Sequence, residues 1–174
     1  MSGILNYDNG NVTSFKDGNC SVNLERVDSF VVLVNLEELN FGKSSSRSDL
    51  LLIRRNGNGR LDVAIFELKG IQEAINSKSI EEIRNHLRAK YDSTVSLLGT
   101  KKLNNSGNHD KINKLDNSFN DLFKDFKIGT KKYVIVIGDH LWSQFTKFVS
   151  QVQTLMGKDC NCEFIKCGEK FYFE

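Results

Sequence analysis

Three charged residues stand where the surrounding sequence is apolar. Glu67 and Lys69 lie near the end of the apolar run 63–68. Asp49 directly precedes a second apolar run, Leu50–Ile53. A strand that is apolar on both faces is usually buried on both faces, and an unpaired charge there is costly. A divalent metal shared by Asp49 and Glu67 would compensate that cost. The alternative is a strand that ends in solvent, where Glu67 and Lys69 form an ordinary surface pair.

The turn between the two apolar runs decides whether Asp49 and Glu67 can meet. Successive residues of a strand point to opposite faces, so a slip of one residue reverses every side chain. The two acids face each other only if Asn56 pairs with Arg60 across a three-residue loop that ends in Gly59. Such loops favour a left-handed residue at their third position, which a glycine adopts without steric cost. The sequence permits this register but does not force it.

An acidic residue on one strand, followed by Glu-x-Lys on the next, resembles the PD-(D/E)xK (restriction-endonuclease-like) nuclease superfamily. The matching residues are Asp49, Glu67 and Lys69, on an apolar hairpin over residues 48–70. Ser48 stands where many members have a proline. The pattern is short, so its specificity comes from its place on the hairpin. The resemblance implies an enzyme that hydrolyses phosphodiester bonds of DNA with Mg²⁺ or Mn²⁺.

The resemblance also implies a role for each residue of the motif. Asp49, Glu67 and the backbone carbonyl of Leu68 would bind the metal through oxygen ligands. The metal would lower the pKa of a bound water and neutralise charge on the phosphate. Lys69 would orient that water or stabilise the developing negative charge.

Further candidates lie outside the motif. Members of the superfamily often take another acidic ligand from the first helix, for which Glu25 is the first choice and Glu37 and Glu38 follow. They often place a Gln or Lys on the helix after the motif strand, which makes Gln72 and Lys90 candidates. Solvated surface charge is the alternative for all of these. A rim of cations that binds the phosphates of nucleic acid would consist of Arg54, Arg55, Arg60, Arg84, Arg88 and Lys90.

The composition is that of an ordinary globular protein. A length of 174 residues predicts a single domain over 1–174 with a sizeable core. The net charge of +2 is small, so DNA binding would require positive charge to gather on one face. No apolar run approaches the roughly 20 residues of a membrane span, and no signal peptide is recognisable. We therefore expect a cytoplasmic protein without a membrane partner.

Hydrophobic periodicity predicts alternating helices and strands. Residues 1–20 are polar and predict a loose arm or a short hairpin, and residues 99–117 predict a flexible loop or an insertion. Residues 23–40 fit a helix, which the resembled fold favours, although a buried strand over 30–36 is the alternative. The other expected elements are a helix over 72–98, a helix over 117–126, a strand over 132–138, a helix over 140–156, and a closing hairpin of strands 162–166 and 170–173.

This order predicts an α/β fold with a mixed central sheet. The strand–helix–strand segment favours parallel pairing in part of the sheet, with helices covering both faces. The order resembles the αβββαβ core of the PD-(D/E)xK fold if one strand is added or moved.

The chain has four cysteines, Cys20, Cys160, Cys162 and Cys167. Some relatives of the resembled superfamily hold an iron–sulfur cluster with one early and three late cysteines. The C-x-C spacing is tight for such ligands, which argues against a cluster. For a cytoplasmic protein we expect thiols rather than disulfides.

Three functions fit these observations. The first is a DNA endonuclease or exonuclease, structure-selective or weakly sequence-specific, that works as a homodimer or in a larger nucleoprotein assembly. The second is a nuclease-fold module without catalysis that binds nucleic acid or a partner protein. The third is a nucleotide-binding α/β protein built on the turn at Val136–His140, which lacks a glycine-rich phosphate cradle.

Overall fold

The structure is a computed structural model of the chain. It describes residues 3–8, 11–24, 31–36, 47–68, 79–98, 112–114, 127–138, 149, 153–154, 156, 158 and 160–173.

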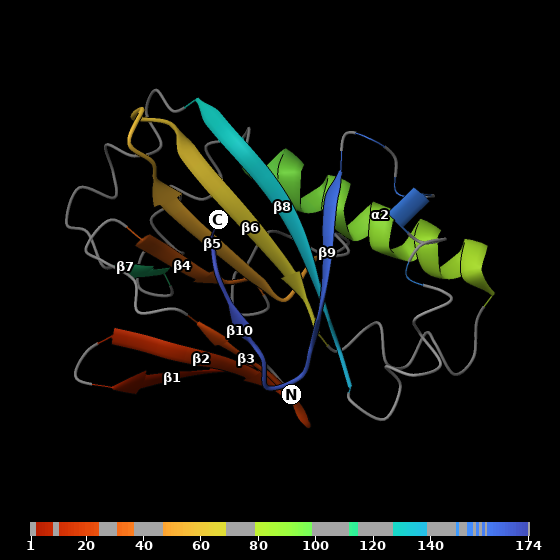
Figure 1. The fold of residues 1–174 in the computed structure, drawn as a ribbon, viewed down its shortest axis with the longest axis horizontal. Helices are drawn as coiled ribbons and strands as arrows, with labels where there is room; N and C mark the ends of the chain where they lie inside the picture. The colour runs from red at the N-terminus through yellow and green to blue at the C-terminus, as the bar shows by residue number, and fades with distance from the viewer. Residues whose placement is uncertain are drawn as a thin grey trace.

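A six-stranded mixed sheet forms the centre of the fold, in the order β7-β4-β5-β6-β8-β9 (Figure 1). Strands β4, β5 and β6 pair antiparallel, whereas β8 pairs parallel with both β6 and β9. The prediction of a mixed, partly parallel sheet is therefore confirmed. The strands are β4 (Val31–Asn35), β5 (Leu50–Arg55), β6 (Leu61–Glu67), β7 (Ile112–Lys114), β8 (Ile128–Ile137) and β9 (Asn161–Lys166).

A second, four-stranded sheet lies alongside the first (Figure 1). Its order is β1-β2-β3-β10, and β10 pairs parallel with β3. Buried side chains of both sheets form one apolar cluster, to which Phe15 and Val22 contribute from the small sheet and Leu52 and Phe66 from the large one. The strands are β1 (Ile4–Asp8), β2 (Asn11–Asp17), β3 (Cys20–Leu24) and β10 (Lys170–Phe171).

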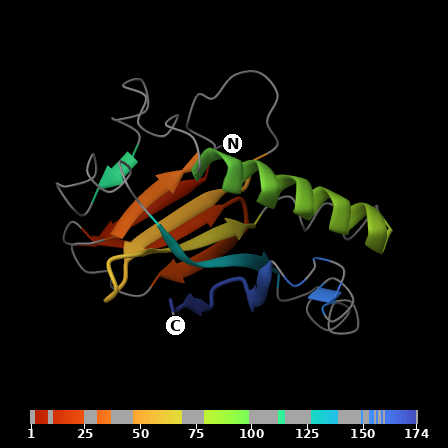
Figure 2. The ribbon, with the colours of Figure 1, turned by 90° about the horizontal axis from the view of Figure 1, so that it is seen from above.

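The other face of the six-stranded sheet packs against helix α2 (Ile80–Leu98), as Figure 2 shows. The helix begins with a capping box: the Ser79 N–H donates to Glu82 Oε2 at 2.9 Å, and the Glu82 N–H donates to Ser79 Oγ at 3.3 Å. Its inner stripe includes Leu87 and Tyr91, which are buried. The Tyr91 ring lies 5.3 Å from the ring of Tyr133 on β8, measured between centroids. This contact fixes which side of the sheet faces the helix.

The motif hairpin has the register that sets Asp49 opposite Glu67, which the sequence permits without forcing. The Asn56 N–H donates to the Arg60 carbonyl at 2.8 Å, and the Gly59 N–H donates back to the Asn56 carbonyl at 3.0 Å. Gly59 has a φ of +73°, the left-handed conformation expected at the third loop position. From this turn β5 and β6 pair without a change of register, as far as Leu50 opposite Phe66.

One prediction for the N-terminal part of the chain needs correction, and one predicted alternative is confirmed. The favoured helix over residues 23–40 is wrong, because β3 ends at Leu24 and β4 occupies Val31–Asn35. The alternative, a strand over 30–36, is closer to the structure, since β4 pairs antiparallel with β5. Of the two alternatives for residues 1–20, a loose arm or a short hairpin, the hairpin is confirmed, because β1 pairs antiparallel with β2, which pairs in turn with β3.

Three predictions for later parts of the chain also need correction. Strands β9 and β10 do not form a hairpin with each other, because β9 pairs with β8 while β10 pairs with β3 in the other sheet. Helices do not cover both faces of the central sheet in the described residues, since the four-stranded sheet packs on one of them. The segment 99–117, expected to be a loop, contains β7.

Some predicted elements lie outside the described residues. These are the helix over 117–126, the first turns of the helix over 72–98, and most of the helix over 140–156. The strand predicted over 132–138 is confirmed, and β8 begins four residues earlier, at Ile128.

Candidate active site

Asp49 and Glu67 lie opposite each other at the neighbouring ends of β5 and β6. Leu50 pairs with Phe66, so the next position of the ladder sets Asp49 against Glu67. In an antiparallel pair, opposite residues have Cβ atoms about 4.5–5.5 Å apart. Both side chains are buried: Asp49 is 2% exposed and Glu67 is 0% exposed. The hairpin therefore carries two carboxylates into the interior next to each other.

Lys90 on α2 supplies the charge partner of Glu67. Its Nζ atom lies 2.5 Å from Glu67 Oε1, and the side chains are 13% and 0% exposed. In a site this poorly solvated, the ion pair offsets the desolvation cost of the carboxylate. The pair joins the helix to the end of the motif strand.

The Asp49 carboxylate is bound by the backbone of the opposite strand. The Leu68 N–H donates to Asp49 Oδ2 at 2.6 Å, and the Asp49 N–H donates to the Phe66 carbonyl at 2.9 Å. The Asp49 side chain thus accepts a hydrogen bond from the Leu68 amide at the point where the pairing of β5 with β6 ends. Asp49 and Leu68 are positioned by each other.

Tyr133 lies beside both carboxylates. Its pKa is raised well above the ordinary value, first by burial and then by the charge of Glu67, with a smaller contribution from Asp49. The neighbouring Ser48 hydroxyl opposes the rise in the pKa. Because both acids act on one phenol, they lie on the same side of the sheet.

A chain of hydrogen bonds attaches this cluster to α2. The Ser48 N–H donates to Thr94 Oγ1 at 3.3 Å, and the Thr94 hydroxyl donates to the Lys90 carbonyl at 2.8 Å. Thr94 is 0% exposed. The start of β5 and the ammonium partner of Glu67 are therefore held by the same turn of the helix.

The raised pKa of Tyr133 predicts a pH dependence of stability. The folded protein holds the phenol proton more tightly than the unfolded chain, so unfolding releases a proton above a pH of about 10. The free energy of unfolding should then fall with rising pH, by up to about 1.4 kcal/mol per pH unit. Denaturant unfolding at a series of pH values should show a shallower fall for Tyr133→Phe. Tyr172→Phe, which changes an exposed tyrosine, is the control, and equal slopes for both variants would contradict the prediction.

The donor set suits a hard divalent cation. Asp49, Glu67 and the Leu68 carbonyl offer oxygen ligands only, as Mg²⁺ prefers, and Mg²⁺ commonly binds one or two carboxylates and keeps several waters. Among the described residues no group of three or more His, Cys, Asp or Glu side chains could hold a metal ion. A metal here would therefore depend on the two carboxylates, a backbone carbonyl, water and substrate oxygens.

Several predicted site residues lie outside the described part of the chain. Lys69, the predicted catalytic ammonium, is one of them, because the described segment that contains β6 ends at Leu68. The further acidic candidates and the helix candidate also lie outside it: Glu25, Glu37, Glu38 and Gln72. The turn proposed for nucleotide binding extends into residues 139 and 140, which are not described either.

The arginines of the hairpin turn lie far from the acidic pair. Arg60 precedes Glu67 by seven residues along an extended strand, a separation of about 20 Å. Arg54 lies with its guanidinium carbon 4.4 Å from the centroid of the Phe173 ring, and its Nε lies 3.7 Å from Asp62 Oδ2. Arg54, Arg55 and Arg60 therefore share one end of the sheet, while Lys90 adjoins the other.

The helix cations differ in what they contact. Arg88 Nε donates to Asp92 Oδ1 at 3.1 Å, and its Nη1 donates to the Met156 carbonyl at 2.6 Å. Arg84 is half-buried. Lys90 contacts Glu67 directly, so the structure places it in the acidic cluster and not on a phosphate-binding rim.

Sequence reasoning missed Tyr133, Ser48 and Thr94. One signal was present: Lys90 and Thr94 stand at helical spacing after the apolar residue Leu87, which puts a charge and a hydroxyl on the inner stripe of α2. Tyr133 begins an apolar strand and does not differ in pattern from a core aromatic residue.

The cysteine prediction is wrong for two of the four residues. Cys20 and Cys167 form a disulfide with Cα atoms 5.2 Å apart, although 147 residues separate them in the sequence. Cys160 and Cys162 remain thiols. A hydrogen bond of the Cys162 thiol to Cys160, together with burial, raises the pKa of Cys162. The pairing depends on where the β9–β10 turn packs against β3, which local sequence does not encode.

None of the described helices is long and apolar enough to span a membrane. Comparison of the chain with protein-family models, with curated proteins and with solved structures found no match.

Proposed function

We propose that this protein is a metal-dependent nuclease of the PD-(D/E)xK type that hydrolyses phosphodiester bonds of DNA. Asp49, Glu67 and the Leu68 carbonyl would hold Mg²⁺ or Mn²⁺. The observation that carries the proposal is the hairpin register, which sets two buried carboxylates opposite each other. A protein interior rarely holds two adjacent carboxylates unless a cation or a chemical task accompanies them.

The succession of elements supports the same proposal. Strands β4, β5 and β6 are followed by α2, the short strand β7 and then β8; β4–β5 and β5–β6 pair antiparallel, and β6–β8 pair parallel. This succession, with β7 as an additional short strand, is compatible with the β–β–β–α–β part of the αβββαβ order that the resemblance implies. The four-stranded sheet on the opposite face is an addition to that order.

In this proposal the chain's own groups position the reactants. Lys90 holds Glu67 and brings a positive charge to the site, and the Leu68 N–H holds Asp49. Tyr133 is neutral and adds no third negative charge to the site. Lys69 remains the proposed ammonium that faces the attacking water. A metal bound there would supply charge neutralisation and a water of lowered pKa.

A nicking assay with purified protein tests the proposal. Supercoiled DNA should be cut in the presence of Mg²⁺ or Mn²⁺, and excess EDTA should stop the cutting. Lys69→Ala should abolish cutting while DNA binding, measured by fluorescence anisotropy, stays close to that of the wild type. Cutting by Lys69→Ala at the wild-type rate would contradict the mechanism.

One observation favours a second function, a nuclease-fold module without catalysis that binds nucleic acid or a partner protein. Each carboxylate already has a hydrogen-bond partner inside the fold, the Leu68 N–H for Asp49 and Lys90 for Glu67. Two carboxylates that only stabilise the fold would have the same contacts. DNA binding by the wild type without cutting at any metal concentration would identify this function.

We also propose that the protein acts as a homodimer or in a larger nucleoprotein assembly, since one small domain has a single site for two DNA strands. A cytoplasmic location is a proposal that the Cys20–Cys167 disulfide opposes, because disulfides are most common in oxidising compartments. Mass spectrometry of protein alkylated at the moment of cell lysis would show which thiol state occurs in the cell.

A further inference from the structure

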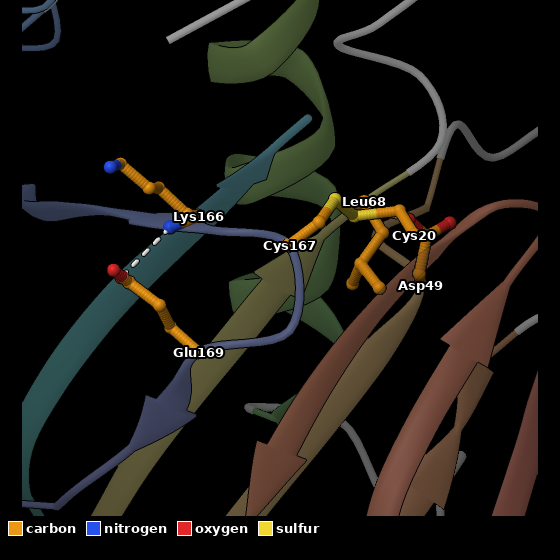
Figure 3. Close-up of a disulfide and its surroundings, with 6 residues drawn as sticks. All are labelled: Cys20, Asp49, Leu68, Lys166, Cys167 and Glu169. Carbon is orange, nitrogen blue, oxygen red and sulfur yellow. Dashed lines mark hydrogen bonds between the residues drawn. A yellow bond between two sulfur atoms is a disulfide. The ribbon is translucent and has the colours of Figure 1, made fainter. Parts of the chain in front are cut away.

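The Cys20–Cys167 disulfide lies beside the end of the motif strand. Cys20 begins β3 of the small sheet, and Cys167 directly follows β9 of the large sheet. Figure 3 shows the disulfide in the same region as Leu68 and Asp49, and Cys20 and Leu68 belong to one buried cluster. The bond therefore fastens the two sheets together close to the proposed metal ligands.

Leu68 connects the disulfide to the acidic pair. Its side chain is fully buried in the same apolar cluster as Cys20, and Cys167 packs against that cluster. Its N–H donates to Asp49 Oδ2 at 2.6 Å. Its carbonyl is the backbone ligand in the proposed function. One peptide segment thus packs on the disulfide, orients one carboxylate and offers one metal ligand.

Backbone hydrogen bonds hold the same turn in place. The Gly168 N–H donates to the Ser21 carbonyl at 2.7 Å, and the Cys167 N–H donates to the Ile137 carbonyl at 2.7 Å. The Asn23 side chain donates to the Gly168 carbonyl at 2.6 Å. Reduction of the disulfide would therefore loosen this junction without releasing it, and the effect on the site would be graded.

We propose that the Cys20–Cys167 disulfide is a positioning element of the metal site, which binds its metal tightly only in the oxidised protein. This inference rests on the proposed function. Reduction by a dithiol breaks the bond between the two sulfur atoms and yields two thiols, while the dithiol is oxidised to its cyclic disulfide. The side chain of Leu68 then packs against two separate thiols instead of a disulfide. Its N–H and its carbonyl are held less firmly beside Asp49.

Two measurements on the full chain test the inference. Calorimetric titration with Mn²⁺ gives the affinity of the site, and amide hydrogen exchange by NMR reports the Leu68 N–H, with the Leu52 amide in the middle of β5 as the internal reference. Dithiol treatment, or the variant Cys20→Ser/Cys167→Ser, should weaken Mn²⁺ binding about tenfold, as loss of an outer-shell partner typically does. The Leu68 amide should exchange faster relative to Leu52. Cys162→Ser, which removes a thiol outside the disulfide, should change neither quantity.

The two measurements separate the possible failures. Unchanged Leu68 exchange and unchanged Mn²⁺ affinity on reduction would overturn the inference. If the oxidised protein binds no Mn²⁺ and cuts no DNA, the proposed function fails, yet Leu68 exchange still decides whether the disulfide positions this segment. Should reduction unfold the protein, Leu68→Ala with the disulfide intact removes the same packing link. Wild-type Mn²⁺ affinity in that variant would overturn the inference.

Discussion

Lys90→Met should lower the free energy of unfolding by about 3–5 kcal/mol, as removal of one partner from a buried ion pair does. The Glu67 side chain is 0% exposed, so the carboxylate left behind has no access to water in exchange for the lost ammonium. Methionine keeps the length and apolar stem of lysine, so the effect reports the charge and not a cavity. Urea unfolding, followed by circular dichroism, measures it.

Two controls accompany this prediction: a double variant that removes both charges, and a variant of a more exposed ion pair. Lys90→Met combined with Glu67→Leu should recover most of the loss, because an apolar pair can replace a buried ion pair at little cost. The ion pair between Lys132 and Glu163 joins β8 and β9 at 3.0 Å, with side chains 19% and 39% exposed. Lys132→Met should cost about 1 kcal/mol or less. Equal losses for the two lysine variants would show that Lys90 is an ordinary surface charge.

The motif hairpin was predictable because its information is local. The glycine at the third loop position and the two apolar runs restrict the register, and the register alone decides that Asp49 faces Glu67. Strand β8 was predictable for a similar reason, since its apolar run fits a buried parallel strand.

The rest of the fold depends on contacts between distant segments. Strand β4 shows helical spacing in its apolar residues and becomes a strand because β5 and β7 flank it. The separation of β9 from β10 follows from the turn at Cys167, which crosses from one sheet to the other. The place of β10 has no local signal, because β10 pairs with β3, 147 residues away in the sequence (Lys170 with Asn23), and the pairing of β4 with β7 spans 80 residues (Leu33 with Asn113).

The same distinction applies to the candidate site. Asp49 and Glu67 were predictable because they interrupt apolar runs on one hairpin. Lys90 was a candidate both for the phosphate-binding rim and, through the resemblance, for the lysine on the helix after the motif strand. Helical spacing places it on the inner stripe of α2, but its contact with Glu67 depends on how the helix packs on the sheet.

Asp49→Asn and Glu67→Gln should each reduce metal-dependent DNA cleavage by about a thousandfold. Each substitution keeps the shape of the side chain and removes one negative charge from the proposed metal site. Charge stabilisation by a metal amounts to several kcal/mol in the transition state, and each step of about 1.4 kcal/mol is tenfold in rate. Single-turnover cleavage of a labelled duplex at saturating Mn²⁺ measures the chemical step, and DNA affinity should stay close to that of the wild type.

Asp62→Asn provides the matched control for this loss. Asp62 lies on the same strand as Glu67 and is buried, but its Oδ1 accepts hydrogen bonds from Asn56 at 3.1 Å and from the Thr130 hydroxyl at 2.9 Å. It lies about 16 Å along β6 from Glu67. Loss of its charge should affect stability and leave the cleavage rate of the folded protein unchanged. If all three substitutions slow cleavage equally, the loss reflects a weakened hairpin and the two opposed acids are not the catalytic pair.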